Sequence, residues 1–270
     1  GAMEIEYAAF LAGYPMPEPI TTLSGDYIGI HQQAESAVWV HLYRWAAGTP
    51  IAWHTVVPGL ANTMGRLLAR MHAIPIATPQ LSRLDCSPSD SHDWYQLFDE
   101  ARARKRSWSE LLSEKIPALL AWEKFVERYA VDDEPLAPSQ RDLHPPNIIA
   151  DSSGGYLVID WDSAGFVNAR EEVVKFALVW ATPEDGAPSP DVVAAFVHGY
   201  REAGGTFRSR GLSDLVHREQ SRLAWIAYNI RRDASENPGP HEWLTPALLE
   251  GTHRPSNDDL NSTVALFKGL

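Results

Sequence analysis

The chain has 270 residues, of which 44% are hydrophobic, a formal net charge of −12 and a single cysteine. This composition supports a sizeable core and excludes both a disulfide framework and a cysteine zinc site, as expected for a cytoplasmic protein. No apolar run approaches the length of a membrane span and no secretory signal is visible, while the negative charge argues against nucleic acid as the main partner and favours a cationic small molecule.

The N-terminal part of the chain predicts a short helix, a group of strands and a second helix. Residues 4–12 favour a helix, and the alternation of apolar and polar residues over 19–47 is typical of strands. The expected strands are 20–22, 27–30 and 37–42. Residues 57–73 predict an amphipathic helix, because Pro58 suits its first turn and apolar residues gather on one face.

The C-terminal part predicts mainly helices. Two are expected at 91–104 and 107–130, the second broken at Pro117 because proline removes an internal hydrogen bond. Further helices are expected at 169–181, 189–203, 211–233, 240–250 and 256–268. Ser256, with Asp259 three residues on, fits the N-cap of the last helix. A few strands followed by a mostly helical lobe predict an α+β fold.

The centre of the chain carries a polar pattern over residues 141–148, Arg-Asp-Leu-His-Pro-Pro-Asn-Ile. Its two prolines deny a helix to the stretch before Asn147. The segments expected next are a strand at 147–150, a Gly-containing turn at 151–155 and a strand at 156–159. This hairpin is expected to place Asn147 and Asp160 at the same end.

Asp142, Asn147 and Asp160 are the residue types of a kinase-type phosphoryl-transfer site. An aspartate accepts or orients the proton of an attacking hydroxyl, and a carboxylate beside an amide carbonyl suits magnesium, which prefers oxygen ligands. We therefore predict Asp142 as the catalytic base, with Asn147 and Asp160 holding Mg²⁺. The alternative is a surface hairpin with ordinary turn acids.

Two segments resemble a known family. Residues 140–147, Gln-Arg-Asp-Leu-His-Pro-Pro-Asn, and 159–165, Ile-Asp-Trp-Asp-Ser-Ala-Gly, are similar to the aminoglycoside phosphotransferase and choline kinase-like superfamily. The resemblance covers most of residues 4–185. It implies a protein-kinase-like fold, the same three site roles, and ATP or GTP as co-substrate.

The resemblance also bears on residues around the central motif. Tyr43 and Arg44 lie where the family's hinge contacts the adenine of the nucleotide through backbone groups. Asp162 is assigned as a further metal ligand, with a contact to a cationic substrate or a loop-closing role as alternatives. His144 either orients the catalytic aspartate or a phosphate, or makes a structural hydrogen bond, and Arg141 is expected to pin the loop from behind.

The chain departs from the family in two respects. Gln140 stands where the family usually has histidine, although glutamine can still form hydrogen bonds locally. No lysine precedes Lys105 and no glycine-rich phosphate loop occurs, so Glu4, the expected partner of a strand lysine, would have none. Three explanations are open. The first is that the chain is a piece cut inside the small lobe, with residues 1–3 as an expression remnant. The others are a naturally short binding protein and a lobe repurposed for other chemistry.

We predict a protein-kinase-like fold with a truncated small lobe at 4–47 and a helical lobe at 48–270 that carries the catalytic hairpin. The first hypothesis is a magnesium-dependent kinase for a hydroxyl group of a small molecule, such as an aminoglycoside-like antibiotic or a metabolite. The alternative is a degenerate lobe that binds a small molecule or a protein partner. A homodimer is expected to cover the open small lobe. The acids assigned to a cationic acceptor are Glu184, Asp185, Asp233, Glu236, Glu242 and Glu250.

Overall fold

A computed structural model describes residues 1–32, 37–76, 92–131, 136–151, 154–183, 186–235, 244–253 and 255–270. The chain divides into two compact units. Unit 1 comprises Gly1–Thr78, Ala137–Phe166 and Phe176–Thr206, and unit 2 comprises Pro79–Leu136, Val167–Lys175 and Phe207–Leu270. All five lysines of the sequence belong to unit 2: Lys105, Lys115, Lys124, Lys175 and Lys268.

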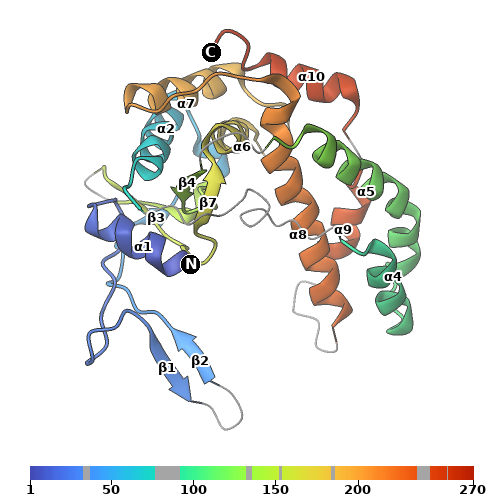
Figure 1. Ribbon diagram of the computed structural model, residues 1–270, viewed down its shortest axis with the longest axis horizontal. Helices are drawn as coiled ribbons and strands as arrows, with labels where there is room; N and C mark the ends of the chain where they lie inside the picture. Colours follow the sequence, from blue (N-terminus) through green and yellow to red (C-terminus); the bar gives the residue numbers. More distant parts are fainter. Residues whose placement is uncertain are drawn as a thin grey trace. The chain divides into compact units, whose positions relative to one another are not determined.

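Unit 1 begins with helix α1 (Ala2–Leu11) and a two-stranded antiparallel ribbon of β1 (Gly29–Gln32) and β2 (Ala37–Val40) (Figure 1). In the register of this ribbon Ile30 lies opposite Trp39. Both side chains are more than half exposed, at 54% and 67%. The ribbon therefore presents apolar surface, as expected for a small lobe with few strands.

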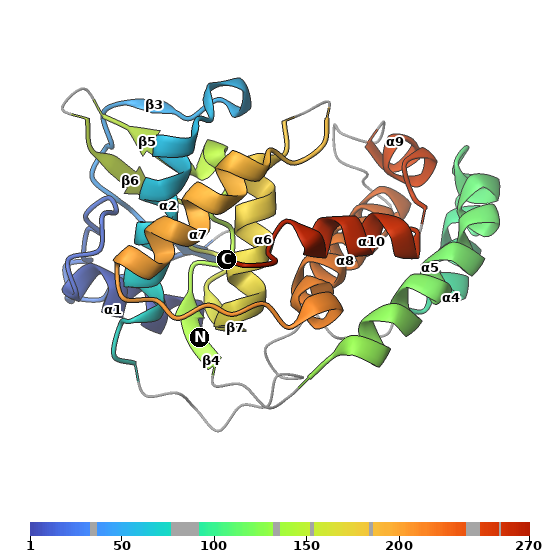
Figure 2. The ribbon, with the colours of Figure 1, turned by 90° about the horizontal axis from the view of Figure 1, so that it is seen from above.

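Three short strands carry the central motif. β3 (Thr49–Pro50), β5 (Ile148–Ala150) and β6 (Tyr156–Val158) form an antiparallel sheet in the order β3-β5-β6 (Figure 2). The predicted hairpin is confirmed. Its first strand begins one residue later than expected, because Asn147 ends a 3₁₀ turn, η2 (Pro145–Asn147).

Helices α2 (Pro58–His72) and α7 (Pro190–Glu202) lie side by side in both ribbon views (Figures 1 and 2). Their backbones approach closely at two glycines. A Cβ atom on Gly65 would lie 2.0 Å from a carbonyl oxygen of α7, and one on Gly199 would lie 2.0 Å from a carbonyl oxygen of α2. Only glycine fits at these two positions without moving the helices apart.

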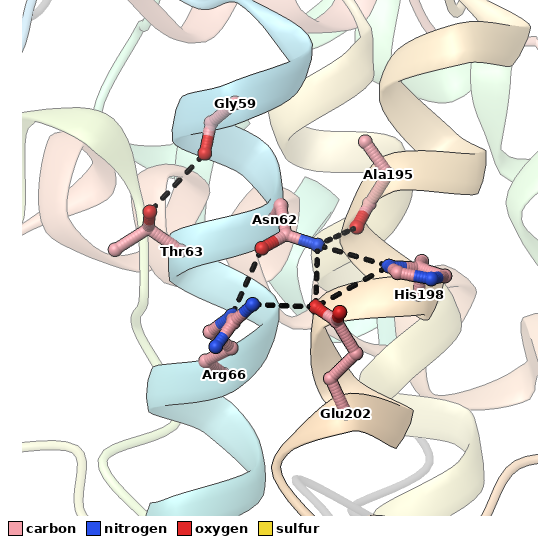
Figure 3. Close-up of polar contacts among 7 residues, drawn as sticks. All are labelled: Gly59, Asn62, Thr63, Arg66, Ala195, His198 and Glu202. Atoms are coloured by element: carbon pink, nitrogen blue, oxygen red, sulfur yellow. Dashed lines mark hydrogen bonds and ion pairs between the residues drawn. The ribbon is translucent and has the colours of Figure 1, made fainter.

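A cluster of polar side chains bridges the outer side of this helix pair (Figure 3). Glu202 accepts hydrogen bonds from Asn62 Nδ2 at 3.2 Å and from an Arg66 guanidinium nitrogen at 2.6 Å. His198 Nδ1 lies 3.3 Å from the same carboxylate. We call these four residues the rim cluster. The Arg66, His198 and Glu202 side chains are all more than a third exposed, so the cluster lies in a high dielectric and contributes little to stability.

A second two-stranded sheet flanks the motif. It joins β4 (Leu136–Ser139) to β7 (Gly165–Asn168), and helix α6 (Ala169–Ala181) follows β7 directly with the predicted bounds. Within unit 1 the indole N–H of Trp180 on α6 donates to the Leu143 carbonyl at 2.9 Å. The central motif is thus tied to a buried helix.

Unit 2 is mainly helical in its described part, which also includes the second half of β7 and the start of α6. Its elements are α4 (Trp94–Ala103), α5 (Ser109–Tyr129), the 3₁₀ turn η3 (Gly211–Leu215), α8 (Val216–Ala234), α9 (Leu244–Glu250) and α10 (Asn257–Ala265). The break expected at Pro117 is not formed, since α5 is continuous and buries Ile116 and Leu119 on either side. The predicted cap is confirmed, because Ser256 Oγ accepts from the Asp259 N–H at 3.1 Å.

The predicted α+β, protein-kinase-like class is confirmed: short antiparallel strands precede and flank a mostly helical chain. Among the described helices, none combines the length and the apolar character that crossing a membrane requires.

Candidate active site

The carboxylate of Asp142 is held at both of its oxygens. Asn147 Nδ2 donates to Asp142 Oδ2 at 2.7 Å and to the Asp142 backbone carbonyl at 2.9 Å. His144 Nδ1 lies 2.5 Å from the other carboxylate oxygen, Oδ1. The Asp142 side chain remains 34% exposed, so it is fixed in direction and still open to a substrate.

The local sequence explains this arrangement. The His144 N–H donates to the Asp142 carbonyl at 2.7 Å, and the Asn147 N–H donates to the His144 carbonyl at 2.9 Å. These two tight turns reverse the chain, because the two prolines of η2 favour the turn and exclude a longer helix. The five-residue spacing therefore returns the Asn147 amide to Asp142.

Asp160 follows β6 in a left-handed conformation, with φ of +60°. The Ile159 N–H donates to the Asn147 carbonyl at 2.9 Å, which joins this residue's loop to the turn that holds Asp142. Partial desolvation, followed by the negative charges of Asp142 and Asp162, raises the pKa of Asp160 above its ordinary value. Two neighbouring carboxylates thus act electrostatically on Asp160.

Trp161 anchors the loop that carries Asp160. Its side chain is buried, and its indole N–H donates to the Val158 carbonyl at 3.1 Å. Its ring meets Tyr14 edge-on at a centroid distance of 5.7 Å. The Val158 N–H donates to the Pro15 carbonyl at 2.8 Å, so the segment after α1 supports the same loop.

Gln140 connects the two loops. Its side chain is buried, and Nε2 donates to the carbonyl oxygens of Ile159 at 3.0 Å and Asp160 at 2.5 Å. Its Oε1 accepts from the Asp142 N–H at 2.9 Å. The sequence predicts only a local hydrogen bond for this residue, because partners 19 and 20 positions away cannot be read from the motif.

The predicted magnesium ligands were tested for fit. No group of three or more His, Cys, Asp or Glu side chains in the described part of the chain is arranged to hold a metal ion. Magnesium needs fewer, since it takes one or two carboxylates and retains water. The Asn147 amide nitrogen is committed to Asp142, which leaves Oδ1 as the atom for a cation. The raised pKa of Asp160 reflects partial desolvation first and then the negative charges of Asp142 and Asp162, and a cation would relieve the repulsion among these charges. Asn147, Asp160 and Asp162 therefore fit the ion.

The two predicted hinge residues differ in their backbone bonding. The Arg44 N–H donates to the Glu18 carbonyl at 2.9 Å, so this amide is already hydrogen-bonded. Tyr43 forms an isolated antiparallel bridge with Pro19. A backbone hydrogen bond between the two segments flanks this bridge on each side, so the N–H and C=O of Tyr43 itself point away from Pro19. This bridge replaces the strand expected at 20–22, a prediction that was wrong because pairing is limited to this one bridge.

Glu6, which the sequence analysis did not select, is the buried carboxylate of α1. The Tyr43 hydroxyl donates to Glu6 Oε1 at 2.6 Å, and His41 Nδ1 lies 3.8 Å from Oε2. Glu4 is instead exposed and accepts from the N-terminal amine of Gly1 at 2.9 Å. The expectation that Glu4 is the unpaired acid of this helix was wrong, because the packing of α1 turns Glu6 inward.

Tyr43 links this acid to the predicted metal site. Burial, the hydrogen bond to Glu6, and the charges of Glu6, Asp162 and Asp160 all raise the pKa of the Tyr43 phenol. The tyrosine therefore stays protonated at neutral pH and acts as a hydrogen-bond donor in an acidic environment.

Arg141 and His144 belong to the loop that carries Asp142, and both pack against neighbouring residues. Arg141 has a φ of +69°, and a Cβ on Gly165 would lie 2.6 Å from its guanidinium, so the arginine packs directly over that glycine. The ring of His144 lies between Trp53, of the 3₁₀ turn η1 (Trp53–Thr55), and Phe176, at centroid distances of 6.2 and 6.0 Å. Both residues support the loop that carries Asp142.

The acids assigned to a cationic acceptor are not alike. Asp233 is fully buried and accepts from Arg232 Nε at 2.7 Å and Thr245 Oγ1 at 2.5 Å, so it is a structural acid of unit 2. Glu250 is exposed at the end of α9. Four others lie outside the described residues: Glu184, Asp185, Glu236 and Glu242.

Comparisons with known proteins identify a family and a shared fold. A family model described as the phosphotransferase enzyme family matches residues 2–211. A spectinomycin phosphotransferase solved with ADP and spectinomycin has a TM-score of 0.67 at 15% identity, over 100% of this chain and 82% of that one. A search of curated proteins found no match.

Two further solved structures share the fold. An amicoumacin kinase in complex with AMP-PNP and Ca²⁺ has a TM-score of 0.61 at 14% identity, over 94% of this chain and 77% of that one. A choline/ethanolamine kinase family protein from Mesorhizobium loti has a TM-score of 0.53 at 13% identity, over 97% and 82%. At such identities the likeness concerns the fold.

Proposed function

The chain belongs to the phosphotransferase enzyme family, and from this premise we propose that it transfers the terminal phosphate of ATP or GTP to a hydroxyl group of a small molecule. The observation that carries the proposal is the grip on Asp142. A general base must be directed at the proton that it takes, and His144 and Asn147 fix both oxygens of this carboxylate while leaving it accessible.

In the proposed reaction Asp142 accepts the proton of the acceptor hydroxyl. The hydroxyl oxygen forms a bond to the γ-phosphorus, and the bond from that phosphorus to the β–γ bridging oxygen breaks, so the nucleoside diphosphate leaves. Asn147 has two duties in this scheme, because its amide nitrogen holds Asp142 and its amide oxygen would be available to the cation.

Mg²⁺ would be held by Asn147 Oδ1 and Asp160, with Asp162 as a further ligand. When bound it would neutralise charge on the phosphates and orient them. The negative charges of Asp142 and Asp162 that act on Asp160 support this assignment, since neighbouring acids favour a cation.

The nucleotide assignment has two supports. Similar folds were solved with ADP and with AMP-PNP. In this chain the Tyr43 backbone is directed away from Pro19, so we assign the adenine contact to Tyr43 and expect less from the Arg44 amide, which is already bonded to Glu18.

The acceptor is proposed to be a small, cationic molecule with a free hydroxyl. The net charge of −12 would steer a cation towards the protein. The spectinomycin and amicoumacin enzymes of similar fold make such antibiotics the first compounds to screen, and resistance to one of them is the phenotype to expect in cells.

A second candidate function is a lobe that binds ligands without phosphoryl transfer. The absence of any lysine before Lys105 favours it, because a lysine grip on the nucleotide phosphates is then missing from this segment. The homodimer over the β1–β2 ribbon and the lobes at 4–47 and 48–270 remain predictions, to be checked by light scattering and by limited proteolysis.

Calorimetric titration with ATP and GTP, with and without Mg²⁺, followed by release of nucleoside diphosphate in the presence of acceptors, tests the proposal. We expect binding that requires Mg²⁺ and product that requires an acceptor. Binding without acceptor-dependent turnover across the screened compounds would favour the second candidate function. No nucleotide binding at all would refute the kinase proposal.

A further inference from the structure

The side-chain amide of Gln140 has only one chemically acceptable orientation. The carbonyl oxygens of Ile159 and Asp160 can only accept hydrogen bonds, and the Asp142 N–H can only donate one. The amide NH₂ must therefore face the two carbonyls and the amide oxygen must face Asp142, as observed. All three bonds are made by a side chain that is only 2% exposed.

The backbone that Gln140 holds is unfavourable by itself. Three non-glycine residues in the described chain have positive φ, and two of them, Arg141 at +69° and Asp160 at +60°, lie next to these hydrogen bonds. Such conformations persist only where the surroundings impose them. The Gln140 amide bonds to the residue after Arg141 and to Asp160 itself, so it is placed to impose both.

Other side chains cannot provide the same three bonds. A neutral imidazole has one donor and one acceptor, so histidine, which is usual at this position in the family, would leave one carbonyl without its donor. An ionised glutamate has no donor and would place a negative charge against two carbonyl oxygens. The amide is the group that satisfies two acceptors and one donor at once.

We infer that Gln140 is a positioning residue that sets the separation of Asp142 and Asp160, through three hydrogen bonds that do not depend on a protonation state. This inference rests on the proposed function, which assigns the hydroxyl proton to Asp142 and the cation to Asp160. The amide acts through the backbone of both residues and contacts no reacting atom.

The experiment compares Gln140→Glu and Gln140→His with a matched control, Gln96→Glu, which makes the same change on the exposed surface of α4. We expect Gln140→Glu to lower kcat about 100-fold, the cost of a displacement of about 1 Å at a catalytic group. Gln140→His, which keeps one donor and one acceptor, should lose less. The acceptor KM should change little for either variant, and Gln96→Glu should match the wild type.

A second measurement does not depend on activity. Hydrogen exchange should be faster in peptides that cover residues 140–144 and 159–162 of the Gln140 variants, and unchanged in α2 and α7. Wild-type kcat with unchanged exchange in both loops would overturn the inference. The inference would also be overturned if exchange rose uniformly along the whole chain while kcat per folded molecule stayed at the wild-type value, because that result marks a purely structural role.

The outcomes separate this inference from the function on which it rests. If the wild type transfers no phosphate but the Gln140 variants still loosen both loops together, the proposed function fails and the coupling of the loops stands. If the wild type is active and the variants are equally active, the proposed function stands and the inference fails. If Gln140→Glu does not fold, Gln140→His decides by the same two measurements.

Discussion

Two regions of unit 1 are held together by opposite means. The two loops of the candidate site are joined by side chains that bond to backbone, with Gln140 and Asn147 at the junctions and partly exposed carboxylates between them. The α2–α7 pair is joined by the close approach of two backbones at Gly65 and Gly199, and the rim cluster forms polar contacts between the same two helices (Figure 3). The first region contains neighbouring negative charges and residues with left-handed backbone conformations, whereas the second consists of closely packed helices.

The comparison shows that unfavourable charges and backbone conformations lie in the loops, whereas favourable packing lies in the helix pair. Positive φ at Asp160 and neighbouring carboxylates are unfavourable in the absence of ligands, and they are tolerated because the rest of the unit is well packed. Substitutions in the loops should therefore change turnover more than stability. Substitutions at the helix contact should change stability more than turnover.

The largest effect is expected at Asp142. Asp142→Asn keeps the size of the side chain but removes the base, so kcat should fall by about 10²–10⁴-fold. The unfolding temperature and the affinity for nucleotide should stay close to wild type, as steady-state kinetics, calorimetry and thermal unfolding would show. The matched control is Asp151→Asn in the turn of the β5–β6 hairpin, where Asp151 Oδ1 accepts from the Gly155 N–H at 2.8 Å. Turnover by Asp142→Asn equal to that of the control would remove Asp142 from the mechanism.

The next effect concerns stability. Gly199→Ala places a Cβ atom 2.0 Å from a carbonyl oxygen of α2, and the helices must separate to accept it. Overpacking of this kind costs about 1–3 kcal/mol of unfolding free energy, which denaturant titration can measure. In Gly59→Ala, on the same helix pair, the new methyl meets no atom within 4 Å, so stability should hold or rise slightly. Equal losses from the two substitutions would contradict the close approach.

A smaller effect is expected from the rim cluster. Arg66→Ala removes a partner of Glu202, but the pair is exposed, so the unfolding temperature should fall by less than about 3 °C. The hydrogen bond from Asn62, and then the charges of Arg66 and His198, lower the pKa of Glu202. The difference between variant and wild type should therefore be present near pH 7 and shrink as pH falls through the pKa of Glu202 in the folded state. A larger loss that persists at low pH would show that the cluster, and not the glycine contact, holds the helices.

The smallest expected effect is a gain in stability, from a substitution at Asp160. The raised pKa of Asp160 means that its ionised form disfavours the folded, metal-free state. Asp160→Asn should raise the unfolding temperature of metal-free protein by less than about 2 °C near pH 7. The gain should vanish as pH falls and Asp160 becomes protonated in the wild type. Added Mg²⁺ should stabilise the wild type and not the variant, and a variant that is less stable at neutral pH without metal would refute the electrostatic account.

The sequence predicted what depends on neighbouring residues. The hairpin after Asn147, the helix over 169–181 and the Ser256 cap all follow from short-range patterns, and all three were found. The close relation of Asp142 and Asn147 was also predictable, because two prolines and a spacing of five residues leave the chain few alternatives.

The features that sequence reasoning missed depend on distant partners. The three bonds of Gln140 need the Asp160 loop in place, and the choice of Glu6 over Glu4 depends on how α1 rotates against Tyr43. Gly65 and Gly199 read as ordinary helix glycines, since 134 positions separate them (199 − 65) and only the packed helices reveal why a side chain is excluded. No local signal identifies any of these.

The distribution of lysine has a practical consequence for labelling chemistry. Because all five lysines belong to unit 2, reagents that acylate lysine amines find no lysine in unit 1. Nucleotide acyl phosphates, which tag a lysine beside the bound phosphate tail, would find no target within the unit that carries Asp142 and Asp160. A silent result from such a probe would therefore not argue against nucleotide binding, whereas carboxyl footprinting would report directly on the acids of this unit.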